Sequence, residues 1–377
     1  MTLELSELIG QPHVVRALTR AAAQGDPAHA YLFEGPPNVG KTSAAVGFGR
    51  ALLCTADADA ACGQCQSCRL AAAGAHPDLR SFRPVISASP PDKPDQWLTA
   101  PAHLLGSLHP LDLLRRLRDE VALRPAFGRR RVVIVEEADR MTEESQNCVL
   151  KTLEEPPEGT ILILTVVNVR NLLSTILSRC QRVPFRLVAP SAIEEWLARW
   201  EEVSQKAALL SRFADGRPGY ALHLGTEPAL WAGRRSVAEL VRSAVAAEPV
   251  DAMRFSESVQ DLAEALWPAD GSVPGYGSLH GTNKTRAQRS KSCEVVEWMT
   301  SWFRDLLLLS LGAAPDRITN VDDTDWLGEA AARQGGVWAG TALETLTATR
   351  RKILQNANLS LVLEAMFTSI ILGQSAN

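Results

Sequence analysis

The sequence predicts an α/β domain with a parallel sheet, followed by an all-α region. Three observations lead to this prediction. Short β-rich runs alternate with helical patterns in the first half of the 377 residues, which is typical of a parallel sheet. The run 132–135 is β-branched throughout, as in a strand buried on both faces. From about residue 228 the pattern is helical almost to the end.

The first elements are a helix within residues 1–29 and a phosphate-binding loop. Residues 35–42 have the G-x4-G-K-T spacing of a P-loop, between an apolar run at 30–33 and a helical pattern. In such loops successive backbone N–H groups and the following helix N-terminus face one anion. Lys41 is expected to reach the β- and γ-phosphates, and the Thr42 hydroxyl to ligate Mg²⁺. The predicted site for ATP or ADP with magnesium comprises Gly35, Pro36, Pro37, Asn38, Val39, Gly40, Lys41, Thr42 and Ser43.

Four cysteines follow the P-loop helix, with the spacing C-x7-C-x2-C-x2-C. In a reducing compartment, cysteines this close are typical of a metal site rather than of disulfides. Four thiolates form a closed tetrahedral zinc site with a structural role. A C-x2-C-x2-C run also occurs in iron–sulfur proteins, but the polar Gly63-Gln64 knuckle and the lack of other redox features favour zinc. The predicted ligands are Cys54, Cys62, Cys65 and Cys68.

The remaining cysteines and a nearby histidine are expected to be structural. Cys148, Cys180 and Cys293 are isolated in the sequence and are predicted to be ordinary core thiols. His76 is close to the cysteines, but four thiolates already complete a tetrahedron, so we expect a loop histidine.

A pair of carboxylates follows the central β-branched strand. Glu136 and Glu137 come directly after 132–135, where P-loop proteins hold Mg²⁺ and polarise the attacking water. We predict that they form this acid pair. Glu136 stands where aspartate is usual, so its longer side chain is expected to place the metal differently.

The other elements of the first half follow from periodicity and breakers. Residues 84–103 are rich in Pro, Ser and Asp and predict an exposed insertion. The expected elements are a strand at 79–82, helices at 111–123 and 140–155, and strands at 160–167 and 183–185.

The second half is predicted to be helical, with one interruption. A capping box of Ser191 and Glu194 is expected to start the first helix after Pro190. Residues 268–292 are full of Gly, Pro, Ser and Asn and predict a mobile loop. The basic residues of that segment favour a solvated loop over a nucleic-acid contact. A last helix at 359–372 places one apolar face toward a bundle or a subunit interface.

Composition excludes some classes of function. The net charge is −4 and the pI about 6.0, so the whole surface does not attract polyanions. The N-terminus lacks the basic and apolar regions of a signal peptide. The most apolar stretch, 302–311, is too short and too charged to span a bilayer. We therefore expect a cytoplasmic protein.

Several motifs together resemble those of the bacterial clamp-loader family of AAA+ proteins, over nearly the whole chain. The cysteine insertion and Ser178-Arg179-Cys180 are specific to that family among AAA+ proteins. The motifs are Gly10-Gln11, the P-loop with its cysteine module, His76-Pro77-Asp78, Glu136 to Met141, Leu150 to Pro157, Thr175 to Cys180, and Asn356 to Leu359.

The resemblance implies an architecture, a role and partners. It implies a RecA-like AAA+ domain at 1–186, a helical lid at 187–226 and a helical collar at 227–377. It implies a hetero-pentameric ring with τ/γ and δ subunits of the DNA polymerase III holoenzyme. Such a ring opens a sliding clamp and places it on primed DNA during replication. Arg179 would be an arginine finger at the neighbouring subunit's ATP site, where such residues contribute roughly 10³–10⁵ in rate.

Within this family, the residues favour the δ′ type of subunit over the τ/γ motor type. Gly219 stands where the motors carry a sensor arginine in the lid, with Arg217 nearby. The strand after Thr160 offers only Thr165 or Asn168 as a sensor-1 residue. A δ′-type subunit that binds nucleotide but hydrolyses it poorly alone fits best. Three alternatives stay open: an active motor, a stand-alone P-loop NTPase or kinase, and a ring member with a relic P-loop.

Overall fold

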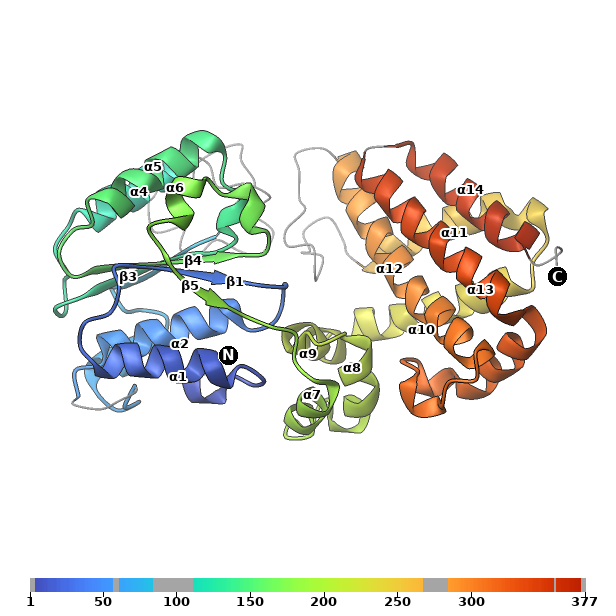
Figure 1. Ribbon diagram of the computed structural model, residues 1–377, viewed down its shortest axis with the longest axis horizontal. Helices are drawn as coiled ribbons and strands as arrows, with labels where there is room; N and C mark the ends of the chain where they lie inside the picture. Colours follow the sequence, from blue (N-terminus) through green and yellow to red (C-terminus); the bar gives the residue numbers. More distant parts are fainter. Residues whose placement is uncertain (1–3, 57–60, 84–110, 267–283, 356, 374–377) are drawn as a thin grey trace. The chain divides into compact units, whose positions relative to one another are not determined.

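The computed structural model describes residues 4–56, 61–83, 111–266, 284–355 and 357–373 (Figure 1). It divides into two compact units, Met1–Ala192 with Arg217–Gly219, and Ile193–Gly216 with Tyr220–Asn377. The predicted insertion at 84–103 lies outside the described residues. The predicted boundary between a lid and a collar at residue 226 falls within the second unit and stays a prediction.

The first unit is built on a parallel five-stranded sheet, as predicted. The order is β2-β3-β4-β1-β5, so the strand before the P-loop lies between the last two strands of the chain order. All pairs are parallel. The strands are β1 Ala30–Glu34, β2 Leu79–Phe82, β3 Arg131–Val135, β4 Thr160–Val166 and β5 Gln181–Pro184.

Helices cover both faces of this sheet (Figure 1). Along β1, Tyr31 and Phe33 pack into the cluster that holds Val14, Leu18 and Phe48, whereas Leu32 packs with helices of the other face. This alternation follows from the period of two in a strand. One face carries α1 Pro12–Ala23 and α2 Lys41–Leu53, and the other carries α4 Leu111–Val121, α5 Glu143–Glu154 and α6 Ser174–Leu177.

The second unit is helical and has an aromatic core. Phe213 packs edge-on against Trp298 and Trp302, with ring centroids 5.9 and 6.1 Å apart. The buried Arg234 guanidinium lies over the Trp302 ring and donates to both carboxylate oxygens of Asp322 at 2.7 and 2.8 Å. The helices are α7 Pro190–Leu197, α8 Ala207–Phe213, α9 Pro218–Thr226, α10 Pro228–Val245, α11 Ala252–Leu266, α12 Lys284–Ser310, α13 Thr324–Leu354 and α14 Leu359–Leu372, of which α7 and α9 begin at residues of the first unit.

Two predicted details of the helical half are wrong. Residues 284–292, predicted as part of a mobile loop, form the first turns of α12. Lys291 is buried there and its Nζ lies 3.0 Å from Glu264 Oε2. Lys, Arg and Gln are good helix formers, and the Gly, Pro and Asn residues that suggested a loop all precede Lys284. Ser191 also lies inside α7 rather than at its N-cap, because the helix begins at Pro190, a residue favoured in the first turn.

In the described part of the chain, no helix is both long and apolar enough to cross a membrane.

Candidate nucleotide site and cysteine cluster

The P-loop backbone has the conformation that its glycines predict. Gly35 has φ 148°, and a Cβ there would lie 2.4 Å from the carbonyl oxygen of Phe185. Gly40, at φ 96°, precedes the first residue of α2, and Asn38 has φ 58°. These positive φ values curl the loop between β1 and α2, which is how a loop turns several N–H groups toward one anion.

Lys41 lies folded against its own loop. Its Nζ donates to the carbonyl oxygens of Gly35 and Pro36 at 2.7 and 2.5 Å. Burial lowers the pKa of Lys41 to about 8, while the carboxylates of Asp139 and Glu137 raise it partly back. A phosphate group in the loop would compete with the two carbonyls for the ammonium group.

Glu136 lies beside the P-loop, held by polar partners on both carboxylate oxygens. Oε2 accepts from the Thr42 hydroxyl at 3.5 Å. Oε1 accepts from the Ser81 hydroxyl at 2.5 Å and from Arg83 Nε at 2.9 Å. Hydroxyl and carboxylate oxygens are ligands that Mg²⁺ accepts, so Thr42 and Glu136 fit a magnesium ion that arrives with a nucleotide. Arg83 places a guanidinium group at the same carboxylate.

Glu137 takes a different position from Glu136. It has φ 50°, and its N–H donates to the Thr165 hydroxyl at 3.0 Å. Arg140 Nε lies 2.7 Å from Glu137 Oε2, although this oxygen has no aligned hydrogen bond. Burial raises the pKa of Glu137, and the Arg140 charge partly opposes that shift. Both predicted acids therefore have an arginine within ion-pair distance.

The two predicted sensor-1 candidates are separated by their contacts. Thr165 is buried in β4 and meets Glu137 directly. Asn168 instead caps a 3-10 turn, because its Oδ1 accepts from the Arg170 N–H at 3.1 Å. The geometry therefore favours Thr165 as the residue next to the acids.

Gly219, which belongs to the first unit, contacts the P-loop. Its N–H donates to the Asn38 carbonyl at 2.9 Å, and a Cβ at Gly219 would lie 3.1 Å from the same oxygen. The position at which motor subunits are expected to carry a sensor arginine is thus close to the P-loop but has no side chain here.

Arg179 lies at the surface of the first unit, just after α6. Its Nη1 donates to the Thr175 carbonyl at 3.0 Å, and its Nη2 lies 2.9 Å from Glu154 Oε1. The side chains of Arg179 and Glu154 are 36% and 44% exposed. This guanidinium is accessible, and its acidic partner lies on the same chain rather than in the nucleotide site.

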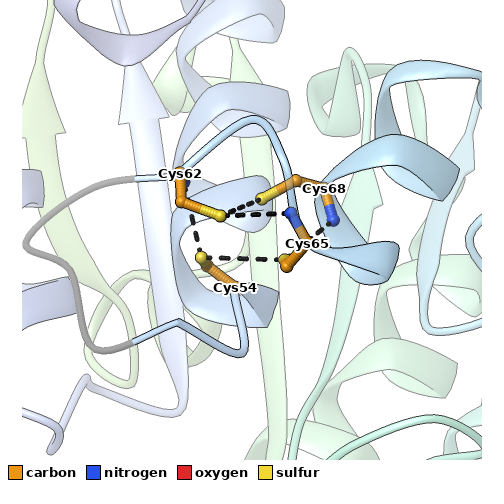
Figure 2. Close-up of side chains that lie close together, drawn as sticks. All are labelled: Cys54, Cys62, Cys65 and Cys68. Carbon is orange, nitrogen blue, oxygen red and sulfur yellow. Dashed lines mark hydrogen bonds between the residues drawn. The ribbon is translucent and has the colours of Figure 1, made fainter.

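The four predicted metal ligands come together in one cluster (Figure 2). Their sulfur atoms all lie within 4.8 Å of one another. The Cys54–Cys65 and Cys62–Cys68 sulfur pairs are 4.0 and 3.9 Å apart. Tetrahedral zinc with Zn–S bonds of about 2.3 Å would hold sulfurs about 3.8 Å apart. The cluster therefore fits a zinc ion in both donor chemistry and spacing.

The chain positions these thiols through local backbone contacts. Cys65 is the N-cap of α3 Gln66–Ala72, where its sulfur accepts from the Cys68 N–H at 3.4 Å. Cys62 sulfur accepts from the Cys65 N–H at 3.3 Å. These two N–H donors stabilise the thiolates of Cys65 and Cys62, and the thiolate is the form that binds metal. Burial has the opposite effect on Cys68, because it raises the pKa of that thiol.

His76 and the other three cysteines are structural, as predicted. His76 Nε2 lies 2.9 Å from the Ser67 hydroxyl, and its Nδ1 accepts from the Asp78 N–H at 3.0 Å. Cys148, Cys180 and Cys293 are buried.

Sequence reasoning missed two residues around the acids. Ser81 and Arg83, which hold Glu136, lie in or just after β2, a strand expected only from its apolar pattern. The parallel pairing of β2 with β3 could have indicated Ser81, because it sets the ends of these strands side by side.

Two family models match the chain in succession. The family described as "DNA polymerase III, delta subunit" matches residues 10–189, and "DNA polymerase III, delta subunit, C terminal" matches residues 279–371. Together they cover most of the chain, including the P-loop, the cysteine cluster and both predicted acids.

Curated relatives give the same picture. The chain is 30% identical to DNA polymerase III subunit delta' of Bacillus subtilis over 212 residues, 56% of this chain and 58% of that protein. It is 38% identical to subunit delta' of Pseudomonas aeruginosa over 173 residues, 46% of this chain and 47% of that protein. It is 28% identical to subunit tau of Bacillus subtilis over 312 residues, 80% of this chain and 49% of that protein. The chain thus spans about half the length of these relatives.

A solved structure of a DNA polymerase III gamma-subunit-related protein from Thermotoga maritima aligns with 95% of this chain and 99% of its own. The TM-score is 0.46 and the identity 15%, which is too low a similarity to assign a function. The two family models, the curated relatives and the parallel sheet with its P-loop agree: the chain belongs to the clamp-loader family of AAA+ proteins, among the DNA polymerase III subunits.

Proposed function

We propose that this chain is the δ′-type subunit of a DNA polymerase III clamp loader. It would assemble with τ/γ and δ subunits in a hetero-pentameric ring that places a sliding clamp on primed DNA in the cytoplasm. Its first unit would bind ATP or ADP with magnesium at residues 35–43, and its cysteine cluster would hold a structural zinc ion.

One observation carries the choice of the δ′ type: both acids at the nucleotide site lie beside arginines, while Arg179 is accessible at the surface. Glu136 accepts from Arg83, and Glu137 lies 2.7 Å from Arg140. A carboxylate that polarises water must be able to accept a hydrogen bond from it. Arg83 and Ser81 already occupy Oε1 of Glu136, and the Arg140 guanidinium lies at Oε2 of Glu137, so fewer carboxylate lone pairs can face an attacking water and we expect the chain's own site to hydrolyse ATP slowly.

Arg179 supports a role at another subunit's site. Its guanidinium could leave the exposed contact with Glu154 at low cost, because exposed ion pairs contribute at most about 1 kcal/mol. At a neighbouring γ-phosphate it would stabilise the charge that develops during phosphoryl transfer. Gly219 agrees with this division of roles, since it offers no arginine to the chain's own nucleotide.

A second candidate is the ATP-hydrolysing τ/γ motor of the same ring. The complete P-loop favours it, because Lys41 and Thr42 are both in place. Identity does not separate the two types: the chain is 38% identical to a delta' subunit and 37% identical to a gamma/tau subunit of Mycobacterium tuberculosis.

ATP turnover distinguishes the two candidates. The purified chain alone is expected to show almost no turnover. A ring assembled with τ/γ and δ subunits is expected to lose on the order of 10³-fold in turnover when Arg179→Ala replaces the wild-type chain. Arg170→Ala, which removes an exposed arginine nearby, is the matched control. Rapid turnover by the chain alone that Lys41→Ala abolishes would establish the motor instead.

A further inference from the structure

Arg83 occupies a place at the acid pair that is built by the sheet. The Glu136 N–H donates to the Phe82 carbonyl at 2.9 Å, so the ends of β2 and β3 lie side by side. Arg83, the residue after β2, thereby faces the Glu136 carboxylate, and its Nε donates to Oε1 at 2.9 Å. The Ser81 hydroxyl donates to the same oxygen at 2.5 Å.

The two oxygens of Glu136 therefore face different partners. Oε2 is turned toward the Thr42 hydroxyl, 3.5 Å away, on the side where a nucleotide's magnesium would lie. Oε1 carries the Arg83 guanidinium, so one positive charge already neutralises this carboxylate. The Glu136 side chain is only 13% exposed, which limits screening of the ion pair by water.

We propose that Arg83 supplies a fixed positive charge at the nucleotide site, so that the chain binds nucleotide with little dependence on Mg²⁺. The guanidinium takes over part of the charge neutralisation that a magnesium ion performs, and it repels a second cation from Glu136. A unit charge about 5 Å away changes ion affinity by on the order of tenfold or more near a protein surface. This inference rests on the nucleotide site proposed above.

The experiment measures the Kd of the full chain for ADP by calorimetry, in millimolar MgCl₂ and in EDTA. For wild type, the ratio of the Kd in EDTA to the Kd in MgCl₂ is expected to stay below about threefold. For Arg83→Gln, which keeps a donor group but removes the charge, the ratio should rise to about tenfold. Arg83→Lys should restore the wild-type ratio.

Arg80→Ala is the matched control, because it removes the same charge three residues earlier, within β2. Arg80 Nε lies 3.5 Å from Glu120 Oε2 and takes no part in the contacts of Glu136. Its Kd ratio should equal that of wild type. Arg83 is 53% exposed, so Arg83→Gln should unfold at the wild-type temperature.

Two results would overturn the inference alone: a wild-type ratio of tenfold or more, or an unchanged ratio in Arg83→Gln. If wild type binds ADP in neither buffer, the proposed nucleotide site fails and the inference fails with it. If wild type binds in both buffers and Lys41→Ala does not bind, the nucleotide site stands whatever the value of the ratio.

Discussion

The cysteine cluster and the acid pair lie in the same unit, yet their partners come from very different distances along the chain. The cluster is complete within residues 54–68, and its backbone donors belong to the same fifteen-residue segment. Glu136 is held instead by Thr42, Ser81 and Arg83, which are 94, 55 and 53 residues away. One site is encoded locally, and the other depends on how the sheet is assembled.

This difference explains which parts of the site a sequence can predict. When the ligands of a site are close together in the sequence, the short segment between them allows few arrangements of their side chains. The spacing alone therefore predicts that they cluster. A strand end is ambiguous in sequence, since its neighbours depend on the strand order. The structure confirmed the clustering of the four thiols. The contacts of Glu136 with Ser81 and Arg83, in contrast, depend on the pairing of β2 with β3, which the sequence does not reveal.

The largest expected effect tests the local site. Cys65→Ser should release zinc and destabilise the chain by more than about 4 kcal/mol, because a structural zinc contributes its binding free energy to folding. The serine hydroxyl can still cap α3 in place of the Cys65 sulfur, so the loss of stability reports the metal site and not the helix start. The measurements are zinc content of the purified protein and its melting temperature.

Cys148→Ala is the control for the cluster. It changes a buried thiol outside the cluster, so zinc content should stay at that of wild type even if the melting temperature falls. Full zinc content in Cys65→Ser would show that the four thiols do not act as one ligand set. The cysteine cluster could then no longer serve as the example of a locally encoded site.

The same reasoning accounts for the fold predicted from sequence. Strands β1, β3 and β4 were predictable because each is a continuous apolar run, and α2 because the P-loop spacing precedes it. The start of α12 was missed because its first residues are polar, and burial of Lys291 depends on Glu264 from another helix. The periodicity of a sequence indicates which face of a helix is apolar, but it does not predict an ion pair between two packed helices, such as Lys291 with Glu264.

The second prediction concerns the P-loop, where a local motif meets a distant environment. Lys41 has a pKa of about 8 in the free chain. Bound phosphates favour the charged lysine, so its pKa is higher in the complex and binding takes up a proton above pH 8. The affinity for ADP is therefore highest below pH 8, where Lys41 is charged, and falls as the pH rises through 8. The Kd for ADP should weaken roughly eightfold between pH 7.5 and 9.0.

Lys41→Arg sharpens this test, because an arginine keeps its charge throughout that range. Its Kd for ADP should be nearly independent of pH, whatever its absolute value. A wild-type Kd that does not change up to pH 9.0 would mean that the distant carboxylates Asp139 and Glu137 keep Lys41 charged, and that the surroundings outweigh burial at this residue.

The smallest expected effect concerns Arg179, whose partner Glu154 is 25 residues away on the same chain. Glu154→Gln removes the acid that holds the guanidinium in the free subunit. Because both side chains are partly exposed, the pair contributes at most about 1 kcal/mol. Ring turnover with limiting amounts of this chain should therefore rise by no more than about fivefold, with an unchanged melting temperature. Glu155→Gln removes the same charge one residue further on and should leave turnover unchanged.

The direction of the change in Glu154→Gln is informative. A rise means that Glu154 competes with the neighbouring γ-phosphate for Arg179, so the free subunit holds its finger in a resting contact. A fall comparable to that of Arg179→Ala would mean that Glu154 positions the guanidinium for its role in the ring. In that case Arg179, like Glu136, would depend for its function on a residue outside its own motif, here Glu154. Only the cysteine cluster would then be encoded locally.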